Sequence, residues 1–155
     1  MNRDFVEMLA ALSAAGVEFL VVGAYALAVH GRPRATGDLD IWVRPTRENA
    51  QRVLAALRSF GAPVHDLTLD ELSSVDLVYQ IGVAPARIDL LTGLTAVTFE
   101  EAWPARTTLT LDGLEVPVIG RDALLRNKRA LGRPRDLADV ADLEGGGEPQ
   151  GPVAP

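Results

Sequence analysis

The stretch VVGAYALAVHGRPRATGDLDIWV, residues 21–43, begins as a buried strand and ends in a second apolar strand that carries two aspartates, Asp38 and Asp40. Side chains alternate across a strand, so both carboxylates face one side while Leu39 and Ile41 face the core. Two carboxylates held side by side repel each other and raise each other's pKa unless a cation lies between them. Because hard divalent ions such as Mg²⁺ prefer oxygen ligands, the pair favours a metal site.

A third carboxylate follows in the run RIDLL, residues 87–91. Ile88 and Leu90 face the core of a predicted strand, so Asp89 faces the opposite side. If this strand neighbours the first, the three carboxylates converge. Three carboxylates suit two metal ions, of which one activates an attacking oxygen and the other neutralises a triphosphate leaving group.

Each motif also has a purely structural interpretation. An aspartate at a strand end commonly lies in a turn or in solvent, and the basic stretch NKRALGRPRDLADVADL, residues 127–143, has the pattern of an amphipathic helix with a solvated face. The order of the motifs favours a functional role. A strand that turns at Gly23 into a short helix offers backbone N–H groups to a phosphate, and the carboxylates follow it along the chain.

The residues around this turn resemble the nucleotidyltransferase superfamily of the DNA polymerase β type. The matching positions are Val22, Gly23 and Ala24, then the run DLDI at residues 38–41, and finally Asp89. The resemblance implies an α/β (α+β) nucleotidyltransferase fold, a short mixed β-sheet with helices packed mainly on one face. It implies a metal-dependent enzyme that moves a nucleoside monophosphate from an NTP to an acceptor hydroxyl and releases pyrophosphate.

The same resemblance implies a role for each matching residue. Asp38, Asp40 and Asp89 are expected to be catalytic and to hold two Mg²⁺ ions. Asp89, as the third carboxylate, is expected to orient or deprotonate the acceptor hydroxyl. Gly23 and Ala24 are expected to hold phosphates of the NTP through their backbone N–H groups.

The C-terminal stretch extends the resemblance to the small bacterial enzymes of toxin–antitoxin and abortive-infection systems. In those enzymes a lysine, an arginine and a following acidic residue close over the nucleotide. The matching positions are Lys128, Arg133 and Asp136, with Asp139 one helical turn later. Arg34, in the loop before the paired aspartates, is a further candidate for nucleotide binding. The expected acceptor is RNA, with tRNA among the options, or a cognate toxin or antitoxin protein.

Two other functions stay open. Ala24 stands where the family usually has a second Gly or a Ser, and it lacks the hydroxyl donor, which favours a catalytically inactive antitoxin or binding module. The run HGRPRATGDLDI, residues 30–41, is similar to the corresponding run of aminoglycoside and lincosamide nucleotidyltransferases, which favours an antibiotic-modifying enzyme.

Composition and charge limit the chemistry, the binding partners and the cellular location that we expect. The chain has 155 residues, 48% of them hydrophobic, and no cysteine, so neither disulfides nor thiolate chemistry is available. The net charge of −6 disfavours indiscriminate nucleic-acid binding, although six of the fifteen basic residues lie within residues 121–135. Acidic residues near the N-terminus break a signal-peptide pattern, and the longest apolar run, residues 19–29, is too short to span a bilayer. We expect a cytoplasmic protein with no membrane partner.

Periodicity and turn signals predict the order of the elements. We expect a domain over residues 1–143 and a disordered tail over residues 144–155, which has nothing apolar to bury. Thr68 and Thr98 begin capping-box motifs, so short helices are expected after both. The other expected helices cover residues 4–15, 24–30, 47–60, 121–131 and 135–143. The expected strands lie within residues 18–22, 38–44, 75–81 and 86–91 and in a hairpin over residues 108–118.

Overall fold

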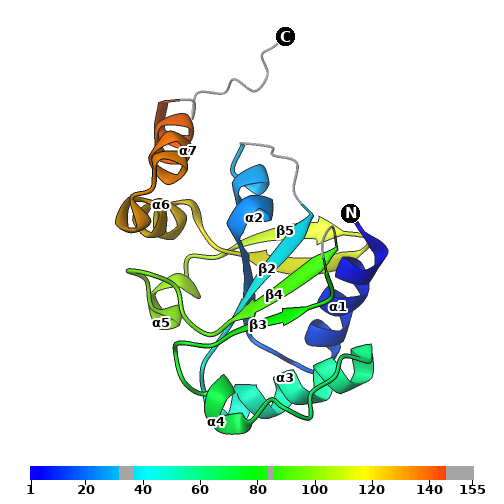
Figure 1. Ribbon diagram of the computed structural model, residues 1–155. Helices are drawn as coiled ribbons and strands as arrows, with labels where there is room; N and C mark the ends of the chain where they lie inside the picture. Colours follow the sequence, from blue (N-terminus) through cyan, green and yellow to red (C-terminus); the bar gives the residue numbers. More distant parts are fainter. Residues whose placement is uncertain (32–36, 84–85, 146–155) are drawn as a thin grey trace.

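The computed structural model of the protein describes residues 1–31, 37–83 and 86–145 (Figure 1). Its helices are α1 (Arg3–Ala14), α2 (Gly23–Val29), α3 (Arg47–Phe60), α4 (Leu69–Leu72), α5 (Phe99–Ala102), α6 (Arg121–Leu131) and α7 (Pro134–Gly145). Its strands are β1 (Phe19–Val22), β2 (Asp38–Val43), β3 (Val78–Ile81), β4 (Arg87–Leu91), β5 (Thr107–Leu111) and β6 (Leu114–Val118). Each expected element is present, with boundaries that differ by a few residues at most.

The strands form one mixed sheet in the order β3-β4-β2-β1-β6-β5. β2 runs parallel to β4 and β1 runs parallel to β6, while the other neighbours are antiparallel. Every residue of β1 is buried, as expected for a central strand. The mixed sheet and its flanking helices confirm the predicted α/β fold class.

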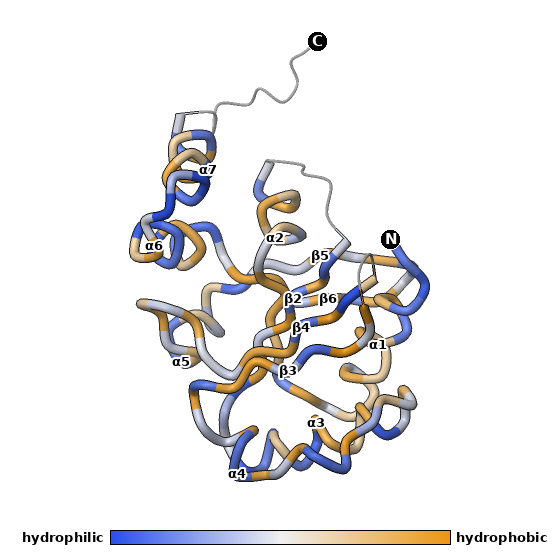
Figure 2. The backbone as a smooth tube through the Cα atoms, in the orientation of Figure 1, coloured by the Kyte–Doolittle hydropathy of each residue, from blue (hydrophilic) through white to orange (hydrophobic). Residues whose placement is uncertain are grey.

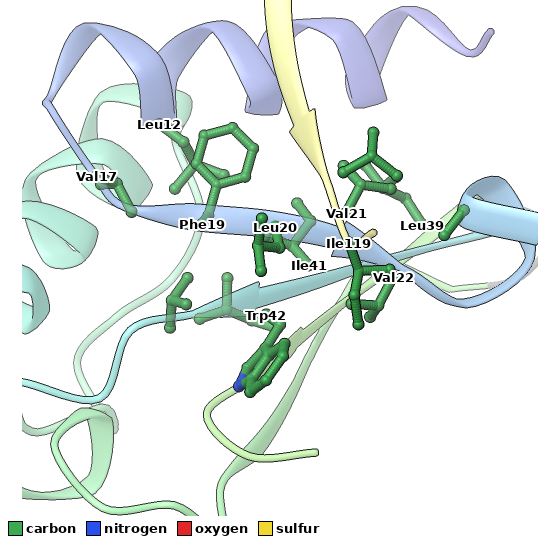
Figure 3. Close-up of a cluster of buried hydrophobic side chains, with 14 of the residues drawn as sticks. Leu12, Val17, Phe19, Leu20, Val21, Val22, Leu39, Ile41, Trp42 and Ile119 are labelled. Atoms are coloured by element: carbon green, nitrogen blue, oxygen red, sulfur yellow. The ribbon is translucent and has the colours of Figure 1, made fainter. Parts of the chain in front are cut away.

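The side chains of β2 divide between the two faces of the sheet. Leu39, Ile41 and Val43 are fully buried on one face. Figure 3 shows Leu12 of α1 and Phe19 of β1 on one side of the central strands, and Trp42 on the opposite side. Figure 2 shows that hydrophobic residues are concentrated in the central strands and that hydrophilic residues are frequent in the outer helices and turns. Burial of each large aliphatic side chain stabilises the fold by about 1.5–3 kcal/mol.

Several predicted boundaries are set by hydrogen-bonded caps. Thr46 accepts a hydrogen bond from the Asn49 N–H at the start of α3, and Gly61 ends that helix in the left-handed region. Complete capping boxes at Thr68 and Thr98 begin α4 and α5. These local signals explain why the helices could be located from the sequence.

The face of β2 that carries Asp38 and Asp40 also carries Trp42, and it divides into a covered half and an open half. Phe99 of α5 packs edge-on against Trp42, with ring centroids 5.1 Å apart, and covers that half. The half with the two aspartates lies beside α2 and α6 (Figure 1). Within the described ranges, the helices are too short or too polar for any of them to cross a membrane.

Candidate active site

Parallel pairing of β2 with β4 brings the three predicted carboxylates to one face of the sheet. Asp40 lies directly opposite Asp89, and Asp38 lies opposite Arg87. Asp89 is buried, whereas the side chain of Asp38 is 37% exposed. The neighbouring strands that the sequence analysis required are therefore present, and their register aligns the aspartates.

Arg87 lies among these carboxylates. Its Nη2 donates to Asp38 Oδ2 at 3.0 Å and to Asp89 Oδ2 at 3.2 Å. Its Nε lies 2.9 Å from Asp89 Oδ1, an ion pair whose angle is not that of a hydrogen bond. The sequence analysis missed this residue. The signal was present in RIDLL, because alternation places Arg87 on the same strand face as Asp89.

Asp40 is the carboxylate whose protonation the site perturbs most clearly. Its pKa is raised to about 6, first by burial, then by the negative charges of Asp89 and Asp38, while Arg87 acts in the opposite direction. Burial and repulsion from the neighbouring carboxylates therefore outweigh the effect of Arg87 on Asp40.

Gly23 passes so close to Asp40 that no side chain fits between them. A Cβ built on Gly23 would lie 2.1 Å from Asp40 Oδ2, and Gly23 has a φ of 72°. Both features require glycine. Ala24 follows in α2, which begins directly after β1 without a side-chain cap, so its first backbone N–H groups keep their capacity to donate.

A cleft of about 490 Å³ lies above the open half of this sheet face. Its sheet side includes Gly23, Ala24, Asp38 and Asp40, and its opposite side is formed by α6 and the start of α7. The lining residues on that opposite side are Leu124, Asn127, Lys128, Leu131, Arg133 and Arg135. The volume falls within the usual range for small-molecule sites. Six of the predicted site residues therefore line one cleft.

Two predicted nucleotide-binding residues are paired with buried carboxylates. Lys128 Nζ lies 3.5 Å from Asp136 Oδ1 and 3.1 Å from Asp139 Oδ2. Arg133 forms a fork to Asp136, with Nε at 2.5 Å and Nη2 at 3.1 Å. Arg133 is the main cause that lowers the pKa of Asp136. Because Asp136 is fully buried, it can act on a nucleotide only by positioning Lys128 and Arg133.

The remaining predicted residues lie outside the cleft lining or outside the described part of the chain. Asp89 is buried beside Asp40 and Arg87. Arg34 lies outside the described residues, as does most of the predicted tail, while α7 extends to Gly145.

The donor chemistry fits a divalent cation, but the present arrangement is closed around Arg87. Carboxylate oxygens suit Mg²⁺, and buried Asp89 Oδ1 has no hydrogen-bond donor among the described groups, so a cation would satisfy it. Within residues 1–31, 37–83 and 86–145, however, no three histidine or acidic side chains are grouped so that they could hold a metal ion. The Arg87 guanidinium lies between Asp38 and Asp89, where a metal ion bound by both carboxylates would lie.

A second pocket adjoins the cleft. It has a volume of about 600 Å³, and its lining includes Trp42, residues 92–98 and Phe99. Leu94 lines both the pocket and the cleft. Arg126 and Asn127 of α6 donate to the carbonyls of Ala96 and Thr95, so this wall is tied to the helix that lines the cleft.

Comparison with known proteins gives a fold assignment. No family model and no curated protein sequence matches the chain. Among solved structures, a presumed nucleotidyltransferase of Thermotoga maritima, TM1012, is 14% identical with a TM-score of 0.59, over 93% of this chain and 92% of that one.

Two antibiotic-related proteins show the same likeness. The lincosamide antibiotic adenylyltransferase LnuA, solved with lincomycin, is 15% identical with a TM-score of 0.59, over 93% of this chain and 96% of that one. The antibiotic-resistance factor ANT(2'')-Ia is 14% identical with a TM-score of 0.58, over 92% of this chain and 82% of that one. The mixed sheet, its helices and these neighbours together show that the chain has the nucleotidyltransferase fold.

Proposed function

We propose that the protein transfers a nucleoside monophosphate from an NTP to an acceptor hydroxyl, with release of pyrophosphate. The observation that carries this proposal is one cleft with opposed walls. Asp38 and Asp40 line one wall beside the turn at Gly23, and Lys128 and Arg133 line the other. In this arrangement the carboxylates can bind cations on one wall, and the basic side chains can bind a polyphosphate on the other.

The three carboxylates bind the metal and act at the reacting phosphate. Asp38, Asp40 and Asp89 would hold Mg²⁺, which supplies Lewis acidity and neutralises charge on the phosphates. The acceptor oxygen forms a bond to the α-phosphorus of the NTP while the bond from that phosphorus to the bridging oxygen breaks. Pyrophosphate leaves with that oxygen. Asp89 orients the acceptor hydroxyl and takes its proton.

The other groups of the cleft hold the triphosphate. The N–H groups of Gly23 and Ala24 donate to phosphate oxygens at the start of α2. Lys128 contributes a point charge and Arg133 a planar fork, and both are held in place by Asp136. Ala24 supplies only its backbone N–H, since its side chain has no donor.

The adjoining pocket favours a small-molecule acceptor as a second candidate beside RNA or a partner protein. Its lining combines Trp42, Phe99 and aliphatic groups, so it suits an acceptor with an apolar portion. LnuA was solved with lincomycin, and ANT(2'')-Ia with adenylyl-2''-tobramycin. The RNA or protein acceptor of a toxin–antitoxin system stays a prediction, and one assay distinguishes the candidates.

The assay supplies each labelled NTP with Mg²⁺ to the protein together with total RNA, a lysate protein fraction, or a panel of hydroxylated antibiotics. We expect label on one acceptor class, released pyrophosphate, and loss of both products in Asp40→Asn. A protein that binds Mg²⁺-NTP but labels nothing, both as wild type and as Ala24→Ser, would contradict transfer and support the inactive binding module.

A further inference from the structure

Arg87 occupies a position that the transfer mechanism leaves unexplained. Its guanidinium bridges Asp38 and Asp89, which come from two neighbouring strands, through the 3.0 Å and 3.2 Å hydrogen bonds of one nitrogen. Arg87 is not among the residues that line the cleft, so a direct phosphate contact does not account for it. Its partners are instead the carboxylates that the proposed function assigns to the metal.

The contacts of Arg87 are unequal in number and in burial. Asp89 receives two of them, from Nη2 and Nε, and its side chain is only 12% exposed. Asp38 receives one, and its side chain is 37% exposed. The Arg87 side chain is itself 32% exposed, so its guanidinium borders solvent. The contact with Asp38 is therefore the one that can be exchanged, while the contact with Asp89 is the more firmly held.

A guanidinium and a divalent cation cannot both use the same carboxylate edges. Positive charges at this separation also repel each other. Arg87 thus has two opposite effects: it relieves repulsion among the carboxylates when no metal is present, and it lowers their affinity for a metal.

We propose that Arg87 is a positioning residue that acts as the built-in counter-ion of this site, holding Asp38 and Asp89 together without metal and releasing Asp38 when a divalent cation binds. The inference rests on the proposed function only in taking these aspartates as the metal ligands. It assigns to Arg87 the control of metal affinity, which no motif of the sequence analysis assigned.

The test is calorimetric titration of Mg²⁺ alone, without nucleotide, into the full chain at about pH 8, with thermal melts of the metal-free protein. Arg87→Gln should bind Mg²⁺ about tenfold more tightly than wild type, since a competing positive charge is gone. The metal-free variant should melt at a lower temperature, and Mg²⁺ should raise that temperature more than it does for wild type.

Arg44→Gln is the matched control. Arg44 also pairs with two carboxylates, Glu18 at 2.5 Å and Glu100 at 2.6 Å, but outside the acidic site. The Arg44→Gln substitution changes the net charge of the protein by the same amount as Arg87→Gln. The Mg²⁺ affinity of this variant should equal that of wild type. An equal gain of affinity in both variants would overturn the proposal, because it would reflect net charge alone.

Arg87→Lys keeps the charge but loses the fork, and it covers the case in which Arg87→Gln does not fold. It should bind Mg²⁺ about twofold to threefold more tightly than wild type, because one ammonium bridges the two aspartates less well. Unchanged or weaker Mg²⁺ binding in the folded Arg87 variants would overturn the proposal. The titration contains no transfer step, so an inactive protein can still confirm the role of Arg87.

Discussion

Two charged clusters face each other across the cleft, and their surroundings shift the pKa values of their carboxylates in opposite directions. On the sheet, Arg87 pairs with Asp38 and Asp89, and burial together with the neighbouring carboxylates raises the pKa of Asp40 to about 6. Between α6 and α7, two cations meet two buried carboxylates, and the pKa of Asp136 is lowered.

The difference lies in whether neighbouring charges stabilise or destabilise the ionised carboxylates of each cluster. A cluster that the chain balances by itself fixes the geometry of two helices. Repulsion among buried carboxylates lowers stability, and a bound cation relieves that repulsion. The following experiments test whether the two clusters divide their roles in this way.

The largest expected effect is on nucleotide transfer. Asp40→Asn should lower the transfer rate by roughly 10³-fold, because it removes an anionic oxygen that the proposed function assigns to the metal. The measurement is labelled-NTP transfer under saturating Mg²⁺, with circular dichroism as the control for folding. Transfer within about tenfold of wild type in a folded Asp40→Asn protein would remove Asp40 from the catalytic site.

The second effect concerns the ion pairs between α6 and α7. Asp136→Asn should lower the free energy of unfolding by about 3 kcal/mol, because it leaves Lys128 buried with too little negative charge. Asp122→Asn is the control, since Asp122 forms an ion pair with Arg121 while its side chain is 97% exposed. Urea unfolding measures both variants. Equal, small losses would show that the cluster contributes little to stability.

The third effect compares the cost of replacing a glycine beside the aspartates of the sheet with that of replacing a glycine beside the ion pairs of α6 and α7. Gly23→Ala should cost about 3 kcal/mol, because it combines a left-handed backbone with a Cβ 2.1 Å from Asp40 Oδ2. Gly132→Ala at the end of α6 should cost about 1 kcal/mol, since its φ is 66° but its Cβ would meet no atom closer than 3.6 Å. Thermal or urea unfolding would contradict this comparison if the two costs were equal.

The smallest expected effect concerns how the free energy of unfolding depends on pH, and the two clusters should contribute to it with opposite signs. The folded state raises the pKa of Asp40 from its ordinary value of 3.8 to about 6, so ionised Asp40 destabilises the fold increasingly as the pH rises from about 4 to about 6. Metal-free Asp40→Asn should therefore be more stable than wild type by about 1–2 kcal/mol at pH 8, an amount reduced for partial exposure, and no more stable at pH 4.

Asp136 should behave in the opposite way. Its lowered pKa means that its ionised form stabilises the fold above about pH 4, and this contribution is lost as the pH falls through the folded-state pKa. Unfolding curves recorded across this range in the presence of a chelator measure both trends. A gain for Asp40→Asn that persists at pH 4 would mean that packing, and not charge repulsion, is the cause.

The sequence by itself determined the elements and the faces on which the charged residues lie. Helical periodicity located Phe5, Met8 and Leu12 on the buried face of α1, and the capping boxes of Thr68 and Thr98 located two short helices. Strand alternation placed Asp38 and Asp40 on one face. These features depend on residues within a few positions of one another, so local physical rules suffice to read them.

Only the tertiary structure decided which of these residues meet. The parallel register of β2 and β4 sets Asp40 opposite Asp89 and brings Arg87 to Asp38 across 49 positions of sequence. The packing of α7 on α6 buries Asp136 and Asp139 against Lys128, whereas the sequence left open a solvated basic face beside the favoured role in nucleotide binding. Such contacts depend on how the whole chain packs, because a cation and its partner far along the chain leave no periodic signal in either segment.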